Sequence, residues 1–431
     1  MRQLNYLILA ACYTLLVILI YVLYLNPVYG YIHFNLLPRS IFFIIFSSLL
    51  AIFPVIFYNG QRAISSYIAI IIYLITYVPT IITLMFALNR SLWEVALVQS
   101  CFTFVMILII IADRVNIKNF IGSFKNKISI QYLNFIILFF TLIVIYSYSG
   151  HLNFVSFAKV YELRASNNQL GINPFVGYIV MWLTYCFYPI YLTLGLLNKK
   201  WLYFIAGCVG EIIIYMCTGA KLALLSPVFI WVIYFVGRKN INRLFSFSIL
   251  SFTIFSTILL ILLGTGNKII YWMSFIVFLR IVGIGGLSNF LYYDFFSTHE
   301  FTYYSHLNIV NFFTKSYPYG TLGLGQVIGK AFYGSSDQNS NANFWAMDGI
   351  ASCGLTGVII ISLVLFFFLV FLNMITKGMN KLFLILIFTS FALTLTNLSL
   401  FTTLLSGGGL LLLIILIFFQ LDISNKLKTG F

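Results

Sequence analysis

Carboxylate and imidazole side chains gather in two polar stretches of an otherwise apolar chain. The stretch DFFSTHEFTYYSH carries Asp294, His299 and His306, and the later stretch NANFWAMDGIASCGLTG carries Asn343 and Asp348. A carboxylate or an imidazole can take the proton from an attacking hydroxyl, so Asp294, His299 and His306 are candidates for catalysis. Asn343 and Asp348 are candidates for binding the pyrophosphate or glycan of a substrate. The alternatives stay open: either histidine can be structural, and Asp348 can cap the helix that follows it.

Arg280 lies in the middle of an apolar segment, Ile269 to Tyr293. A charge at membrane depth costs at least a few kcal/mol, and such residues are functional candidates by default. A guanidinium binds phosphate oxygens through two parallel hydrogen bonds, which favours a phosphate-bearing ligand and a role in stabilising a departing pyrophosphate. A purely structural role for this arginine is the alternative.

Two further cations each follow an acidic residue. Arg164 comes two residues after Glu162, and Lys221 follows Glu211 across the turn CTGAK, with Glu211 inside an apolar helix. Together with Arg280, these residues suit the binding of a lipid-linked pyrophosphate and its glycan. The alternatives are a simple ion pair between Glu211 and Lys221 and an ordinary solvated position for Arg164.

Motifs for other chemistries are absent from the sequence. It contains no GxxxxGK[ST] loop, no HExxH and no closely spaced acidic pair that would hold a metal-bound nucleotide sugar. The six cysteines lie in or beside apolar runs without a CxxC pair. We therefore expect no metal and no other cofactor.

The elements that position these residues are membrane helices. With 62% hydrophobic residues, 8% charged residues and a mean hydropathy of +1.04, the chain has too little polar surface for a soluble protein. The apolar runs predict an all-α polytopic membrane protein with about twelve transmembrane helices. They are Leu4 to Leu25, Ile41 to Tyr58, Ile64 to Leu88, Val95 to Ala112, Tyr132 to Ser149, Pro174 to Leu197, Trp201 to Cys217, Ala220 to Val236, Leu244 to Leu263, Ile350 to Leu372, Leu382 to Phe401 and Leu404 to Leu421.

The distribution of charge predicts the topology. The chain carries a formal net charge of +15, and with its N-terminus inside, the inner face nets +13 and the outer face +2. This is the positive-inside pattern, so the basic charge needs no nucleic-acid partner and both termini are predicted to be cytoplasmic.

Two large outer loops interrupt the single membrane domain, 1–431. The first is Gly150 to Pro174, and the second is Gly264 to Gly349. The second contains the apolar segment around Arg280. If that segment crossed the membrane, the later basic loops KGMNK and NKLK would lie outside, so we predict a re-entrant or interfacial element.

The order of these features resembles the O-antigen and capsular polysaccharide polymerases (Wzy-type), bacterial membrane glycosyltransferases similar in fold to the O-antigen ligases. The resemblance covers nearly the whole length in architecture. It rests on VYELRASN in the first loop, TGAKLALLSP at the eighth span, and FLRIVGIGG, YPYG and NANFWAMDGIASCGLTG in the second loop. It implies a fold like that of the GT-C membrane glycosyltransferases.

The resemblance implies that the chain polymerises undecaprenyl-pyrophosphate-linked repeat units into O-antigen or capsular polysaccharide. The polymerisation would take place at the outer leaflet of the bacterial inner membrane, as part of lipopolysaccharide or polysaccharide biosynthesis. The expected partners are the lipid-linked glycan, membrane lipids, a chain-length regulator and a flippase. The family's outer-loop arginines correspond to Arg164 and Arg280. Two alternatives stay open: an O-antigen ligase, and a polysaccharide flippase or transporter.

Overall fold

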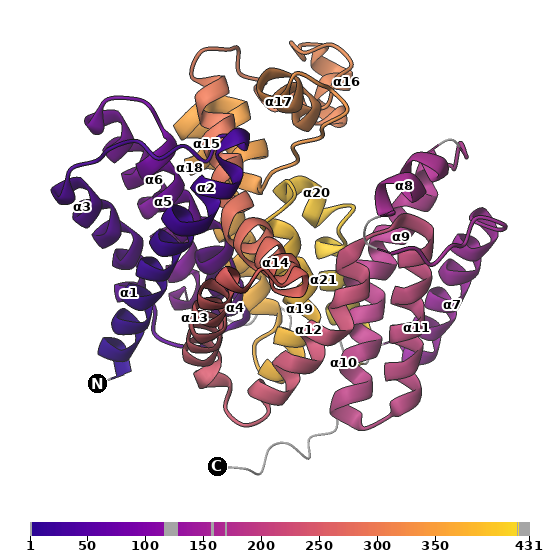
Figure 1. Cartoon of the computed structure of the whole chain (residues 1–431). Coiled ribbons are helices and arrows are strands. Elements are labelled where there is room, and N and C mark those ends of the chain that lie inside the picture. Colours follow the sequence, from indigo (N-terminus) through magenta and orange to yellow (C-terminus); the bar gives the residue numbers. More distant parts are fainter. Residues whose placement is uncertain (1, 116–127, 157–158, 169, 420, 422–431) are drawn as a thin grey trace. The chain divides into compact units, whose positions relative to one another are not determined.

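The computed structural model describes residues 2–115, 128–156, 159–168, 170–419 and 421, and these residues form an all-α protein (Figure 1). Among them the only β-type pairing is an isolated bridge between Ile128 and Phe419. The chain divides into two compact units. One comprises Met1–Val115, Asn242–Val370 and Leu393–Phe401, and the other comprises Asn116–Ile241, Phe371–Ala392 and Thr402–Phe431.

The first unit contains the whole of the second predicted loop and its candidate residues. Its helices are α1 (Arg2–Ile20), α2 (Asn26–Tyr29), α3 (Ile41–Ile52), α4 (Ile64–Ile72), α5 (Val78–Ala87), α6 (Leu92–Ile111), α13 (Leu244–Leu262), α14 (Lys268–Ser274), α15 (Ile284–Phe296), α16 (Asn308–Thr314), α17 (Leu324–Tyr333), the larger part of α18 (Ala351–Ile375) and the start of α20 (Leu400–Leu404).

The second unit contains the first predicted loop and the turn before Lys221. Its helices are α7 (Ile130–Ser147), α8 (Val160–Asn168), α9 (Pro174–Trp182), α10 (Tyr188–Asn198), α11 (Trp201–Thr218), α12 (Lys221–Gly237), most of α19 (Lys381–Leu395) and α21 (Gly409–Phe418).

The prediction of an all-α multi-pass membrane protein is confirmed. Ten helical segments of the described chain are long and apolar enough to cross a membrane, and three shorter apolar helices cover 41–57, 221–237 and 381–395. Each of the twelve predicted spans falls on one of these helices. The one long segment of the described chain without a predicted span is Lys268–Phe296, which contains the stretch Ile269 to Tyr293 that we predict to be re-entrant or interfacial.

The segment Lys268–Phe296 is a continuous helix built from α14, a π-helical stretch Phe275–Gly283, and α15. In its first half, Phe275 and Phe278 pack against Tyr29 and Tyr24 at the end of the first span. π-helical turns are a recognised cause of helix kinks and occur often at functional sites. Arg280 lies within this π-helical stretch, so the helix is irregular at the residue of greatest functional interest.

The second half of this segment packs closely on α5 and on the π-helical turn before it, Tyr73–Tyr77, because Gly285 and Gly286 have no side chain. An added Cβ at Gly286 would lie 2.4 Å from the carbonyl oxygen of Pro79 and from Thr83 Oγ1. Small residues that bring backbones together are the usual means of packing membrane helices. A buried amide completes the contact, with Asn289 Nδ2 donating to Thr80 Oγ1 at 2.7 Å. The packing fixes α15, and therefore the residues at its end.

We expect Gly286→Ala to destabilise the folded protein, because a backbone oxygen cannot move aside for the added methyl group. Overpacking of this kind costs about 1–3 kcal/mol. The measurement is the thermal midpoint of the detergent-solubilised protein. The matched control is Gly264→Ala, since nothing lies within 4 Å of an added Cβ there. Equal midpoints for the two variants would contradict the close approach of α15 and α5.

Whether the segment within Lys268–Phe296 re-enters or crosses the membrane can be tested by finding the side of the bilayer on which flanking residues lie. If α13 crosses and Lys268–Phe296 re-enters, reporters fused at Lys239 and Asp337 lie on opposite faces, with Lys239 cytoplasmic. If both segments cross, the two reporters lie on the same face. We expect opposite faces, because that arrangement keeps the later basic loops inside. Paired reporters with compartment-specific signals provide the measurement.

Candidate functional site

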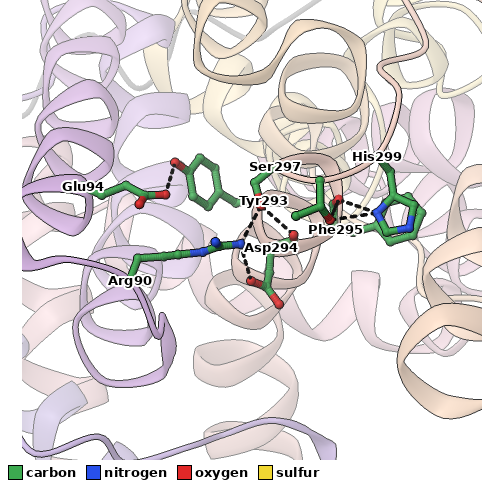
Figure 2. Close-up of polar contacts among 8 residues, drawn as sticks. Arg90, Glu94, Tyr293, Asp294, Phe295, Ser297 and His299 are labelled. Carbon is green, nitrogen blue, oxygen red and sulfur yellow. Dashed lines mark hydrogen bonds and ion pairs between the residues drawn. The ribbon is translucent and has the colours of Figure 1, made fainter.

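The C-terminal end of α15 carries a hydrogen-bonded group of charged side chains (Figure 2). Arg90, in the turn between α5 and α6, places Nη2 3.4 Å from Asp294 Oδ1 and donates to Ser297 Oγ at 2.9 Å. The side chains of Arg90 and Asp294 are 33% and 37% exposed. Exposed ion pairs contribute about 0–1 kcal/mol, so this pair can exchange its partner for a ligand at little cost.

A second bridge joins α15 directly to α6. Tyr293 Oη donates to Glu94 Oε1 at 3.2 Å. Glu94 lies in the first turn of α6, which Ser91 caps, and a carboxylate is favoured there by the helix dipole. Sequence reasoning selected Asp294 but missed Arg90 and Glu94. The partners are 204 and 199 residues apart, so no local pattern indicates that they meet.

His299 lies exposed just beyond α15, and its ring is held from two sides. The ring stacks on Phe295 with centroids 3.9 Å apart and an interplanar angle of 10°. Nδ1 lies 2.9 Å from the Phe295 carbonyl oxygen and 3.0 Å from Thr298 Oγ1. The imidazole is therefore fixed in orientation although it faces solvent.

The Asp348 carboxylate is fully buried and joins three segments of the first unit. Oδ2 accepts a hydrogen bond from the backbone N–H of Leu400, the first residue of α20. Oδ1 lies 3.4 Å from His306 Nε2, on the loop after α15. A buried carboxylate requires such partners. The interpretation of Asp348 as the cap of its own span is corrected: it caps α20 instead.

Asn343 provides the cap at the start of the helical stretch that leads into α18. Its Oδ1 accepts from the N–H groups of Trp345 and Ala346 at 3.0 and 3.3 Å. Its Nδ2 donates to Gly285 O and Ser288 Oγ on α15. The amide is fully buried and both its ends are hydrogen-bonded, so its observed contacts are structural, and its contact with a glycan stays a prediction.

A break in α18 lies just beyond Asp348. Cys353 and Gly354 leave helical geometry, with Gly354 at φ 62° and ψ −139°, a conformation that favours glycine. The loop after α15 pairs with the carbonyl groups that flank the break. Thr302 N–H donates to Ala351 O at 2.8 Å, and Tyr303 N–H donates to Ser352 O at 3.0 Å. Irregular backbone at membrane depth needs such partners from within the protein.

Tyr304 lies beside this break, and its hydroxyl group is free to donate a hydrogen bond. Its hydroxyl is buried and has no hydrogen-bond partner among the described residues. Burial, and to a lesser extent Cys353 and Asp348, raise the pKa of Tyr304 to about 12. The phenol is therefore neutral at physiological pH and can donate a hydrogen bond to a ligand oxygen.

Arg280 is exposed on its helix, with its guanidinium 5.5 Å from the ring centroid of Phe275. The two ion pairs formed among the described residues are Arg90 with Asp294 and His306 with Asp348, and Arg280 belongs to neither. An exposed guanidinium on a membrane-length helix must reach water, a polar cavity or an anionic group. The structure thus leaves its charge free for a ligand.

Arg164, in the second unit, binds the end of α11. Nε and Nη2 donate to the carbonyl oxygens of Thr218 and Gly219 at 3.3 and 3.1 Å. Asn167 on the same helix, α8, donates to Cys217 O. A cation at a helix C-terminus satisfies the last carbonyls and the helix dipole. Arg164 is therefore more than a solvated loop residue, because it positions α8 on the turn before Lys221.

The Glu211 side chain is fully buried in α11 and accepts a hydrogen bond from Ser226 Oγ at 2.7 Å. Its second oxygen has no hydrogen-bond partner among the described residues. The ion pairs of the described chain do not include Glu211 with Lys221, so that alternative is not formed. Lys221 begins α12 and is half-buried, and Glu162 lies exposed on α8.

The structure thus brings some predicted residues together and separates the roles of others. In the first unit, His306 meets Asp348, while Asp294 meets Arg90 near His299. In the second unit, Arg164 reaches the turn that precedes Lys221. No three His, Cys, Asp or Glu side chains gather as metal ligands within the part of the chain that the structure describes. The grouping favours acid–base and anion-binding chemistry by side chains.

No family model, curated protein or solved structure that was compared matches this chain. The fold itself defines the class: this is an all-α, multi-pass membrane protein with about ten candidate spans. Its polar side chains gather beyond one end of α15 and around the break in α18.

We expect Asp348→Ala to destabilise the protein strongly, because it leaves the Leu400 N–H and the His306 ring without their buried acceptor. Removing one partner of a buried pair costs about 3–5 kcal/mol. The measurement is the folded fraction and thermal midpoint after solubilisation. Asp337→Ala is the control, since Asp337 is exposed on a loop. Matching midpoints for both variants would show that Asp348 does not hold the three segments together.

Proposed function

We propose that this protein is a bacterial inner-membrane glycosyltransferase, GT-C-like in fold, that polymerises undecaprenyl-pyrophosphate-linked repeat units into O-antigen or capsular polysaccharide. In this proposal both termini are cytoplasmic and the reaction takes place at the outer leaflet. The observation that carries it is Arg280, an exposed guanidinium without a carboxylate partner among the described residues, on an apolar helix of membrane length. A lipid-linked pyrophosphate has the charge and the location that such a residue requires.

The proposed reaction is a nucleophilic substitution at the anomeric carbon of the donor sugar. The hydroxyl of an acceptor sugar attacks, the new glycosidic bond forms, and the bond to the pyrophosphate oxygen breaks. The leaving undecaprenyl pyrophosphate keeps the electron pair. A guanidinium can offset the charge that develops on the leaving oxygen, and a base takes the proton from the hydroxyl. The candidate residues in the first unit offer both kinds of group.

The cations of the second unit have supporting parts in this proposal. Arg164 donates hydrogen bonds from Nε and Nη2 to the carbonyl oxygens at the end of α11, so it can hold the turn before Lys221 in place. Lys221 is then presented at the start of α12. Their contact with the pyrophosphate or glycan is a prediction, as is that of Glu211 and Glu162.

The polymerase differs from an O-antigen ligase in the acceptor and from a flippase in making a bond. Surface glycan from cells that lack this gene distinguishes all three. Single repeats on the lipid anchor indicate a polymerase. Free polymer beside a bare anchor indicates a ligase, and the loss of all surface glycan indicates a flippase. We expect single repeats.

Arg280→Ala should reduce chain extension by about a hundredfold or more, the effect of removing one preorganised charge-stabilising group. Arg280→Lys should restore only part of it, because a point charge replaces a planar two-pronged donor. The measurement is the length distribution of polymer made from lipid-linked repeats at matched membrane expression.

The matched controls for Arg280 are Lys315→Ala, at the end of α16, and Lys330→Ala, in the last turn of α17, which remove exposed cations of the same unit. We expect both to make wild-type ladders. A wild-type ladder from Arg280→Ala would remove this residue from the mechanism and withdraw the main support for the proposed function. An equal loss in the controls would show that net charge matters and not this guanidinium.

A further inference from the structure

The two histidines beyond α15 have different hydrogen-bonding environments, although the sequence treats them alike. At His306, both ring nitrogens face protein groups: Nδ1 lies 3.0 Å from Thr302 Oγ1, and Nε2 lies 3.4 Å from Asp348 Oδ1. The His306 side chain is only 6% exposed. Neither of its nitrogens is available to a substrate.

At His299 the hydrogen positions follow from its neighbours. The Phe295 carbonyl oxygen can only accept a hydrogen bond, so Nδ1 must carry the hydrogen that it shares with that oxygen. The Thr298 hydroxyl gives its own hydrogen to the same carbonyl and so also accepts from Nδ1. In the neutral imidazole this leaves Nε2 with its lone pair, and this nitrogen of the exposed side chain has no hydrogen-bond partner among the described residues.

We propose that His299 Nε2 is the general base of this protein and that the end of α15 is the subsite for the acceptor sugar. This assignment rests on the proposed function. In the reaction, the attacking hydroxyl oxygen forms the bond to the anomeric carbon and its proton moves to Nε2. The pyrophosphate oxygen leaves with the electron pair of the broken bond.

The surroundings of His299 suit a sugar with several hydroxyl groups. Asp294 offers carboxylate oxygens that accept hydrogen bonds, and Arg90 offers donors, on the same end of α15 (Figure 2). Both are about one-third exposed. Stacking on Phe295 keeps the imidazole in one orientation, so the base is placed before the acceptor arrives. The site thus combines an oriented base with donors and acceptors for the neighbouring hydroxyls.

The test uses a substitution that keeps the local hydrogen bond and removes only the base. In His299→Asn, the side-chain amide can still donate to the Phe295 carbonyl, but nothing replaces Nε2. Purified full-length protein is given lipid-linked repeat units, and the initial rate of bond formation is measured. We expect His299→Asn to lose about a hundredfold in rate, the lower part of the range for general-base catalysis. Its thermal midpoint should match the wild type.

Chemical rescue separates catalysis from structure. His299→Ala opens a space where free imidazole can supply the missing base, so added imidazole should raise its rate severalfold and leave His299→Asn unchanged. His151→Asn is the matched control, because His151 is exposed on a loop of the second unit. It should keep the wild-type rate.

The two proposals fail in distinguishable ways. If the wild-type protein forms no glycosidic bond from lipid-linked repeats, the proposed function is overturned. If the wild type polymerises and His299→Asn does so at the same rate, only the assignment of the base is overturned. A slow His299→Ala that imidazole does not rescue would also count against His299 as the base.

Discussion

The buried carboxylate of Asp348 is the interaction on which the polar part of the first unit depends. It binds the N–H at the start of α20 and lies against His306, so one charge connects segments that are 42 and 52 residues away in the sequence. In a low-dielectric interior a carboxylate without partners is very unfavourable. The loop after α15 and the start of α20 therefore have to form together with the segment that carries Asp348.

This constraint separates the charged residues into two groups. One group consists of Asp348, His306 and the amide of Asn343. Their hydrogen bonds are made within the group or to the protein around it, and they hold the ends of helices in place. Arg280, His299 and the pair of Arg90 with Asp294 remain open to solvent or to the membrane. The first group positions the helices, and the second group has donors and acceptors that can bind a ligand. Fewer residues are therefore candidates for ligand binding or catalysis than the sequence alone suggests.

Much of the fold follows from the sequence because apolar length determines membrane helices. Nine of the twelve predicted spans fall on helices long enough to cross a membrane and three fall on shorter apolar helices, since about twenty apolar residues have no other stable arrangement in a bilayer. The contacts of the polar residues do not follow in the same way. The partners of Asp294, Asn289 and Asp348 are all distant in sequence. The irregular backbone at Cys353 and Gly354 is also hidden, because ASCGLTGV reads as the start of an ordinary helix.

The pairing of Thr302 and Tyr303 with the carbonyl groups of Ala351 and Ser352 has a consequence for local unfolding. Amide hydrogens in a surface loop usually exchange with solvent through small local fluctuations. These two amides are bound to a membrane helix, so their exchange requires the junction at Cys353 and Gly354 to open as well. We therefore expect the loop and the first turn of α18 to open together, as one cooperative unit.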